Sequence, residues 1–344
     1  MSRPSTPNPT LVKPSAHETH SATWALVADD LVKTYPTGRG KVPIQALSGL
    51  TLRVGAGQVF GLLGPNGAGK STTVKILSTL SRQDSGEAEV AGLDVRRQAG
   101  AIRARIGLVS QKSSSAPMST GRESLELAAR IHGRSRRDAR ARAGDLLGRF
   151  GLDDAADRLT KTYSGGMARK LDVAIGLVHR PEVLFLDEPT TGLDPEARTE
   201  MWAEISRLAV VEQVTVLLTT HYLDEADHLA DRLAIIDHGR VVAEGTPDEL
   251  KSELAGDTVQ LEVVDLDDIS LALQRLSQIE GLTEVTATGR TLRARAELGA
   301  RAIPAILAAL EQAQIPVASA TVARPSLDDV YLRHAGRTFE EVAR

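Results

Sequence analysis

Between residues 64 and 72 the chain reads Gly64-Pro65-Asn66-Gly67-Ala68-Gly69-Lys70-Ser71-Thr72. An apolar run at residues 59–63 precedes this segment, and a run with helical spacing follows at residues 71–80. Glycines let consecutive backbone N–H groups point at phosphate oxygens, and the start of the following helix adds a partial positive charge. We therefore predict a phosphate-binding loop, with residues 64–72 as the nucleotide-binding segment.

Two side chains of this loop have predicted roles. Lys70 is expected to reach the β- and γ-phosphates of a nucleotide, and Ser71 is expected to ligate Mg²⁺. A glycine-rich turn without a ligand is the alternative interpretation. The complete motif in its strand-to-helix context favours the nucleotide site.

A pair of carboxylates ends another predicted buried strand. Residues 183–186 are apolar, and Asp187 and Glu188 follow directly. A buried strand can deliver an acid to a metal at its carboxyl end, so we expect Asp187 to hold Mg²⁺, largely through water. Glu188 is then placed to orient or deprotonate the water that attacks the γ-phosphate. Together with the phosphate-binding loop, this pair predicts hydrolysis of a nucleoside triphosphate.

Strand and helix signals alternate through the first part of the chain, which predicts an α/β sheet domain at residues 23–255. Strands are expected at residues 58–63, 105–109, 183–186, 214–219 and 233–237. From about residue 120 to 180 the sequence favours helix, which predicts an inserted helical lobe. Residues 1–22 are rich in Pro, Ser and Thr, and they are predicted to form a disordered tail.

The remainder, residues 256–344, is predicted to be a small accessory domain. Strands are expected at residues 259–263, 285–296 as a hairpin, and 317–322, and helices at residues 269–278 and 302–312. This order, βαββαβ, predicts a ferredoxin-like α+β fold. We see no cluster of metal ligands or nucleophiles in its sequence, so its role is not predicted.

The composition excludes several function classes. Basic and acidic residues nearly balance, at 41 against 45, so a global attraction to nucleic acid is not expected. The chain has no cysteine, which excludes disulfides and thiolate metal sites. Its apolar runs fall far short of the roughly 18–20 residues of a membrane helix, so the chain is not expected to span a bilayer by itself.

The segment Tyr163-Ser-Gly-Gly-Met167 resembles the LSGGQ signature of ABC ATPases, and it begins 24 residues before Asp187 (187 − 163). In that family the signature faces the phosphate-binding loop of a second cassette, so two ATP molecules are held in a head-to-tail dimer. The resemblance implies that Ser164, Gly165 and Gly166 bind nucleotide and that a second cassette, expected to be an identical copy, is a partner. The sequence departs from the family pattern because Tyr163 replaces Leu and Met167 replaces Gln.

Other residues match the same family in the expected order along residues 26–250. Tyr35 resembles the aromatic residue that stacks on adenine. Gln111 resembles the glutamine that senses Mg²⁺ and the γ-phosphate, and His221 resembles the switch histidine that contacts the γ-phosphate. Asp194, in the segment Gly192-Leu-Asp-Pro195, matches the D-loop of the family, which implies a part in binding the nucleotide. The resemblance thus implies that Gln111 and His221 join Glu188 in catalysis.

The function that these residues imply is that of an ATP-binding and hydrolysing subunit of an ABC transporter, acting with a membrane permease at the cytoplasmic face of the membrane. Residues 325–331 resemble a segment of the daunorubicin and doxorubicin resistance type, which favours export of a drug-like or amphipathic compound. A soluble ABC ATPase that acts on ribosomes or DNA is the alternative. A G protein is excluded, because no Asn-Lys-x-Asp guanine motif occurs.

Overall fold

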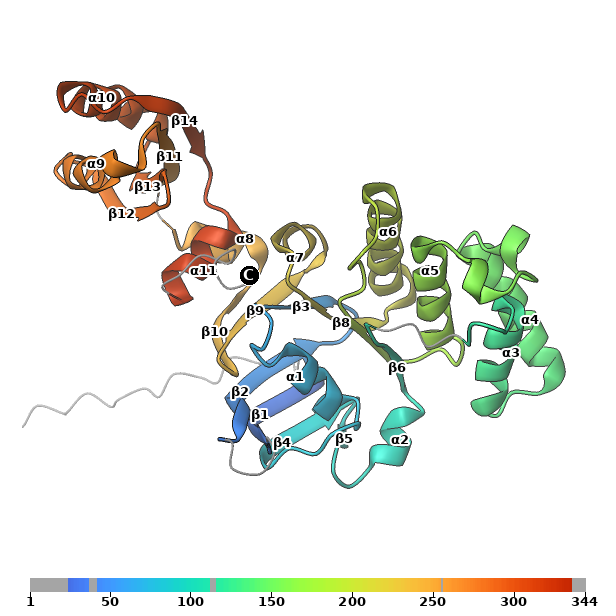
Figure 1. Cartoon of the computed structure of the whole chain (residues 1–344). Coiled ribbons are helices and arrows are strands. Elements are labelled where there is room, and N and C mark those ends of the chain that lie inside the picture. Colours follow the sequence, from blue (N-terminus) through green and yellow to red (C-terminus); the bar gives the residue numbers. More distant parts are fainter. Residues whose placement is uncertain (1–23, 37–41, 112–115, 255, 336–344) are drawn as a thin grey trace, which may run out of the picture.

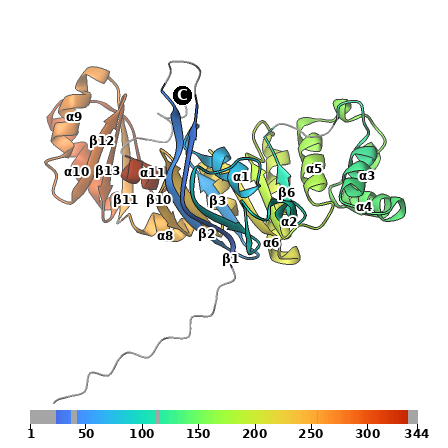
Figure 2. The same cartoon turned by 90° about the horizontal axis from the view of Figure 1, so that it is seen from below.

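The computed structural model describes residues 24–36, 42–111, 116–254 and 256–335. The expected tail at residues 1–22 lies outside these ranges. The described part forms three β-sheets with helices packed around them. One group of helices lies at one end of the molecule, and the C-terminal sheet lies at the other (Figure 1, Figure 2).

The central sheet has the strand order β10-β9-β3-β8-β7-β6. Its strands are β3 (Val59–Leu63), β6 (Ile106–Val109), β7 (Val183–Asp187), β8 (Thr215–Thr220), β9 (Arg232–Asp237) and β10 (Arg240–Gly245). All neighbours in this sheet pair in parallel except β10, which pairs antiparallel with β9. This arrangement confirms the predicted α/β sheet.

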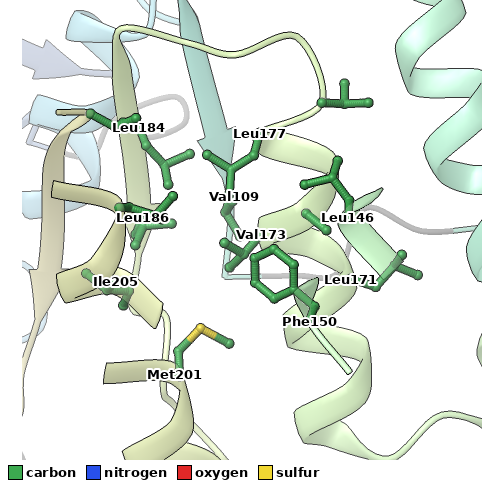
Figure 3. Close-up of a cluster of buried hydrophobic side chains, with 14 of the residues drawn as sticks. Val109, Leu146, Phe150, Leu171, Val173, Leu177, Leu184, Leu186, Met201 and Ile205 are labelled. Atoms are coloured by element: carbon green, nitrogen blue, oxygen red, sulfur yellow. The ribbon is translucent and has the colours of Figure 1, made fainter. Parts of the chain in front are cut away.

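Residues 183–186 of β7 are all apolar because both faces of this strand are buried. Val183 and Phe185 face one core, which β7 shares with the N-terminal sheet and α1 (Lys70–Leu77). Leu184 and Leu186 face the other core, which is formed with the helices on the opposite side (Figure 3). Because side chains alternate between the two faces of a strand, a sheet covered on both sides needs apolar residues at every position.

A four-stranded antiparallel sheet, with two strands before the phosphate-binding loop in the sequence and two after it, has the order β2-β1-β4-β5. Its strands are β1 (Trp24–Tyr35), β2 (Ile44–Gly55), β4 (Ser85–Val90) and β5 (Leu93–Asp94), and α2 (Ala99–Arg103) follows. Strands β1 and β2 span 12 residues each and are longer than any strand that the sequence predicts. Several register shifts interrupt their pairing, so the pattern in the sequence looks shorter than the strands are.

The predicted helical region contains α3 (Gly121–Ile131), α4 (Arg136–Arg149) and α5 (Gly165–Gly176), with short 3-10 turns at Asp153–Ala155 and Thr160–Thr162. Helix α3 begins with a capping box, because the Thr120 hydroxyl accepts from the Glu123 N–H while the Glu123 carboxylate accepts from the Thr120 N–H. Helices α6 (Pro195–Glu212) and α7 (Leu223–Leu229) connect β7 to β8 and β8 to β9, and α8 (Pro247–Ser252) follows β10.

The C-terminal sheet has the order β12-β13-β11-β14, and every neighbouring pair is antiparallel. Its elements are β11 (Asp257–Val263), a 3-10 turn (Leu266–Asp268), α9 (Ile269–Leu276), β12 (Leu282–Thr288), β13 (Thr291–Ala296), α10 (Gly299–Gln312) and β14 (Val317–Ala323). This succession confirms the predicted βαββαβ order and the ferredoxin-like fold. The sheet has its own apolar core with α9 and α10.

A last helix, α11 (Leu327–Ala335), was not predicted from the sequence. It leaves the C-terminal sheet and packs against the edge of the central sheet, where Tyr331 is fully buried in a cluster that includes Leu63 and Leu233. An ion pair of 2.8 Å between Arg293 Nη1 and Asp328 Oδ2 joins the helix back to β13. The helix thus contacts both parts of the chain. The domain boundary at residues 255 and 256 stays a prediction.

Among the helices that the structure describes, none combines the length and the apolar character that a membrane crossing requires.

Candidate functional site

The predicted phosphate-binding loop lies between β3 and α1, and a cavity of about 210 Å³ opens over it. Tyr35, Ile44, Ala46, Pro65, Asn66, Gly67, Gly69, Lys70, Ser71, Thr72 and Glu188 line this cavity. Gly67 and Gly69 have backbone φ values of 83° and 114°, which residues other than glycine rarely adopt. A Cβ atom at Gly69 would also lie 2.7 Å from the Ala46 carbonyl oxygen. The loop therefore requires glycine at this position.

Lys70 is 5% exposed and lies at the base of the cavity. Its Nζ donates hydrogen bonds to the carbonyl oxygens of Gly64 and Pro65, at 2.6 and 3.2 Å, and lies 3.9 Å from Glu188 Oε1. Burial lowers the pKa of Lys70, while the charges of Glu188 and Asp187 oppose this shift. The loop holds the ammonium group where a phosphate of a bound nucleotide would meet it.

Ser71 and Asp187 come together as the sequence predicted. The Ser71 hydroxyl donates to Asp187 Oδ1 at 3.1 Å, and the Thr219 hydroxyl donates to the same oxygen at 2.6 Å. A hydroxyl and a carboxylate fit Mg²⁺, which prefers oxygen ligands and keeps several waters and phosphate oxygens in its shell. Among the described residues no group of three or more His, Cys, Asp or Glu side chains could hold a metal by itself. This site would thus depend on the nucleotide for its remaining ligands.

Glu188 is the centre of a polar cluster. Gln111 Nε2 donates to its Oε2 at 3.0 Å, Thr191 Oγ1 donates to the same atom at 3.4 Å, and His221 Nδ1 lies 3.2 Å from Oε1. Glu188 has a φ of 50°, an unusual value for a residue other than glycine, and its N–H donates to the Thr219 carbonyl at 3.2 Å. Such strained conformations are maintained where the surrounding structure fixes them, often at functional sites.

These side chains come together because they follow neighbouring parallel strands. Gln111, Glu188 and His221 come after β6, β7 and β8, and the phosphate-binding loop comes after β3. The carboxyl ends of parallel strands lie at one edge of a sheet, where ligands of open α/β sheets bind. The arrangement can bind a phosphorylated nucleotide and place a carboxylate beside its terminal phosphate.

The signature segment lies elsewhere in the fold, at the start of α5. The Ser164 hydroxyl accepts a hydrogen bond from the Met167 N–H at 3.2 Å and caps this helix. Asp194 caps α6 in the same way, accepting from the Ala197 N–H at 2.8 Å. A Cβ atom at Gly166 would lie 3.0 Å from the Ala197 Cβ, so the starts of the two helices are adjacent.

None of Ser164, Gly165, Gly166 and Asp194 is among the described residues that line the cavity of the phosphate-binding loop. The predicted site residues therefore form two groups. One group, around Lys70 and Glu188, lines the cavity or contacts side chains that line it. The other group, at the starts of α5 and α6, lies outside the cavity.

Sequence reasoning missed several residues of the site. Ile44, 60% exposed, and Ala46 line the cavity beside Tyr35, and no motif marks them. Thr219 contacts both Asp187 and Glu188, and its place at the end of an apolar strand is the signal that could have found it.

Glu225, at the start of α7, was also missed. Its side chain is buried, and its Oε1 accepts hydrogen bonds from Thr190 Oγ1 at 2.8 Å and Trp202 Nε1 at 3.4 Å. Burial raises the pKa of the Glu225 carboxyl, against the lowering effect of these hydrogen bonds. This carboxyl links the turn after Glu188 to the helix after His221.

Comparison with known proteins gives matches over most of the chain. Residues 47–191 match the family described as ABC transporter, and residues 245–335 match the family described as ATP-binding protein DrrA1-3-like, C-terminal domain. The daunorubicin resistance ATP-binding protein DrrA3 of Streptomyces coeruleorubidus is 48% identical over 87% of this chain and 94% of its own length. The daunorubicin/doxorubicin resistance ATP-binding protein DrrA of Streptomyces peucetius is 46% identical over 93% and 97%.

Relatives with other named functions are also similar. The linearmycin resistance ATP-binding protein LnrL of Bacillus subtilis (strain 168) is 34% identical over 92% of this chain and 100% of its own length. A solved structure, described as a dimeric post-hydrolysis state of the ATP-binding cassette MJ0796 bound to ADP and Pi, has a TM-score of 0.60 and 26% identity. It covers 64% of this chain and 98% of its own.

Proposed function

The chain belongs to the ATP-binding subunits of ABC transporters, of the daunorubicin/doxorubicin resistance type, and we propose that it energises the export of a drug-like or amphipathic compound through a separate permease. The chain is an ATPase of this family. The cluster around Glu188 is the observation that carries the assignment of its chemistry, because it places a carboxylate, a lysine, an amide and an imidazole around one point.

The hydrolytic step follows from the geometry of this cluster. Lys70 and the loop amides hold the β- and γ-phosphates, and they stabilise the charge that develops as the terminal phosphoryl group leaves. Ser71 and Asp187 are proposed to hold Mg²⁺ with help from Gln111. When bound, the metal would neutralise phosphate charge. Glu188 is proposed to orient the attacking water and accept its proton, while His221 contacts the γ-phosphate.

The adenine is proposed to lie at the outer part of the cavity, against Tyr35 and Ile44. A stacked aromatic ring contributes about 1–3 kcal/mol to the binding of a base. The ring of Tyr35 lies under Lys33, with 5.4 Å from its Nζ to the ring centroid. An exposed isoleucine on the next strand would add apolar contact to the same base.

The two groups of site residues support a site shared between two chains. Ser164, Gly165, Gly166 and Asp194 lie outside the cavity of their own chain, and Ser164 and the glycines offer a hydroxyl and free helix-start amides that suit a phosphate. We propose that they complete the nucleotide site of a second copy in a head-to-tail dimer. A similar cassette, MJ0796, was solved as a dimer.

The chain is proposed to bind a membrane permease at the cytoplasmic face of the membrane. Export is supported by relatives named for resistance to daunorubicin, doxorubicin and linearmycin. The alternative, a soluble ATPase acting on ribosomes or DNA, has no support among these relatives. Choice of the transported compound is expected to reside mainly in the permease.

Affinity purification of the tagged chain from detergent-solubilised membranes of its native cells tests this proposal. A multi-spanning membrane protein in near-equal amount is the expected result, with the Glu188→Gln chain as a matched bait that retains ATP. Ribosomal or DNA-bound partners in place of a membrane protein would overturn the assignment to transport.

A further inference from the structure

Arg169 lies on α5 and reaches two catalytic loops at once. Its Nη1 donates to the Ser110 carbonyl oxygen at 2.6 Å, on the loop that carries Gln111. Its Nη2 donates to the carbonyl oxygens of Asp187 and Glu188 at 2.9 and 3.1 Å, and its Nε donates to that of Pro189 at 2.8 Å. One side chain therefore holds the backbone of both loops.

Burying the charged guanidinium of Arg169 costs free energy, and the contacts that compensate this cost suit arginine alone. Arg169 is 8% exposed, and burial lowers its pKa against the nearby charges of Asp172, Asp187, Glu225 and Glu188. A buried charge persists only where hydrogen bonds and counter-charges compensate it. The planar fork of arginine supplies several donors in fixed directions, which lysine cannot do. The contacts thus need arginine at this position.

The same helix carries the signature segment at its start. Ser164 caps α5, and Arg169 follows five residues later (169 − 164), or about 7.5 Å along the axis at 1.5 Å per residue. The helix between them is short and continuous. A displacement of its start is therefore transmitted to Arg169 with little loss.

We propose that Arg169 is a positioning residue that couples the signature end of α5 to the hydrolytic carboxylate of its own chain. When the nucleotide of the partner cassette engages Ser164 and the following glycines, α5 moves, and Arg169 carries that movement to the backbone of Glu188 and to the loop of Gln111. Each chain thereby aligns its own catalytic group in response to the nucleotide that it helps the partner to bind. This inference rests on the proposed head-to-tail dimer.

Lys170 provides a matched control on the same helix. Its Nζ pairs with Glu200 Oε2 on α6 at 2.7 Å, with side-chain exposures of 23% and 53%. The Lys170→Met substitution removes a charge next to Arg169 without touching either catalytic loop. It is expected to leave ATP hydrolysis within about twofold of the wild type, because exposed ion pairs contribute little.

The test compares the wild type with Arg169→Gln, Arg169→Lys and Lys170→Met in the full-length chain. ATP affinity is measured by calorimetry, and kcat and the Hill coefficient by steady-state hydrolysis, each corrected for the folded fraction. For Arg169→Gln we expect kcat to fall by about 10–100-fold, because a misplaced catalytic group costs on this scale. The affinity for ATP stays within about threefold, because Arg169 does not line the cavity. The Hill coefficient falls towards one.

Arg169→Lys is expected to give an intermediate kcat and a partly retained Hill coefficient. If the glutamine variant does not fold, the lysine variant alone tests the positioning role of Arg169. A purely structural role would lower the melting temperature while leaving kcat per folded molecule and the Hill coefficient unchanged, and that result would overturn the inference. A wild type that hydrolyses ATP without cooperativity would instead count against the proposed dimer on which the inference rests.

Discussion

The central sheet and the C-terminal sheet are built on different principles. In the central sheet, residues 183–186 of β7 are all buried, because helices and a second sheet cover both faces. In the C-terminal sheet, residues 318–323 of the edge strand β14 are all exposed, and the main apolar core lies on the side of α9 and α10. The proposed catalytic side chains Gln111, Glu188 and His221 follow strands of the central sheet, namely β6, β7 and β8.

This contrast shows how the fold fixes the positions of Asp187 and Glu188. Asp187 and Glu188 are held at the end of a strand that cannot shift without disturbing two cores, which keeps their positions fixed before the nucleotide arrives. The C-terminal sheet contacts the rest of the chain mainly through α11, with Tyr331 in the apolar cluster and Arg293 paired to Asp328. We therefore expect substitutions in the two sheets to have separable effects.

The largest effect is expected for Glu188→Gln, which alters the chemistry at the central sheet without changing either core. Removal of a positioned base lowers kcat by roughly 10²–10⁴-fold, while ATP still binds. Single-turnover hydrolysis and equilibrium ATP binding measure the two quantities. Near-normal turnover would show that another group accepts the proton, and His221 would be the next to substitute.

The second prediction concerns the C-terminal core. Leu261 is fully buried there, so Leu261→Ala is expected to destabilise the C-terminal sheet by about 2–5 kcal/mol. Because no residue of this sheet lines the nucleotide cavity, kcat should change by less than about twofold. Denaturant unfolding followed beside ATP hydrolysis checks this.

The exposed Leu271→Ala on α9 serves as the control for Leu261→Ala, since Leu271 is 40% exposed and should lose much less stability. Loss of hydrolysis in parallel with unfolding of the C-terminal sheet would show that the two regions are one cooperative unit and would refute the separation argued above.

Lys70→Ala tests the binding side of the central site. The substitution removes the ammonium group at the base of the cavity, and charge-assisted hydrogen bonds contribute about 1.5–3 kcal/mol, so ATP affinity should weaken by about 10–100-fold. Calorimetric titration with ATP measures the change, and Lys75→Ala on the same helix is the control. An unchanged affinity would contradict the predicted phosphate-binding role of the loop.

The smallest effect concerns pH and the junction between the helical region and the central sheet. The rings of His132 and His179 stack at 3.8 Å, and His179 Nε2 donates to the Ile106 carbonyl oxygen of β6 at 2.9 Å. Burial, and then the charge of His132, lower the pKa of His179 to about 4. Between pH 6.5 and 4 the unfolded chain thus binds more protons at this residue than the folded chain.

Stability should accordingly fall by about 1–2 kcal/mol as the pH falls through this range, after allowance for partial solvent screening. Denaturant unfolding at pH 7.5, 6, 5 and 4 measures the change, and the slope assigned to His179 should be missing from the His179→Leu variant. An equal slope in that variant would place the titration on other groups.

Much of the fold could be predicted because local sequence patterns specify it. The glycine-rich loop after β3, the apolar runs that become β7 and β8, and the order of elements in the C-terminal sheet all leave a signal within a few residues. The turn between β9 and β10 has a local signal too, because His238 and Gly239 adopt the positive φ that a two-residue hairpin turn needs, at 46° and 75°.

The remainder depends on contacts between distant parts of the chain. Helix α11 spans nine residues and is stabilised by packing against β9 and α8, which its own sequence does not reveal. Arg169 and Glu225 lie within ordinary helical patterns, and only their hydrogen bonds to loops 20 and 35 residues away in sequence give them a place in the site. Bulged pairing similarly concealed the length of β1 and β2.

The central claim is that each nucleotide site is completed by a second chain, and ATP-dependent dimerisation tests it most directly. Sedimentation velocity of the Glu188→Gln chain, with and without ATP and Mg²⁺, should show a monomer that becomes a dimer holding two nucleotides. The Ser164→Arg chain in the same background should bind ATP and stay monomeric. A Glu188→Gln chain that remains monomeric when saturated with ATP, or a Ser164→Arg chain that dimerises as well as its parent, would contradict the account.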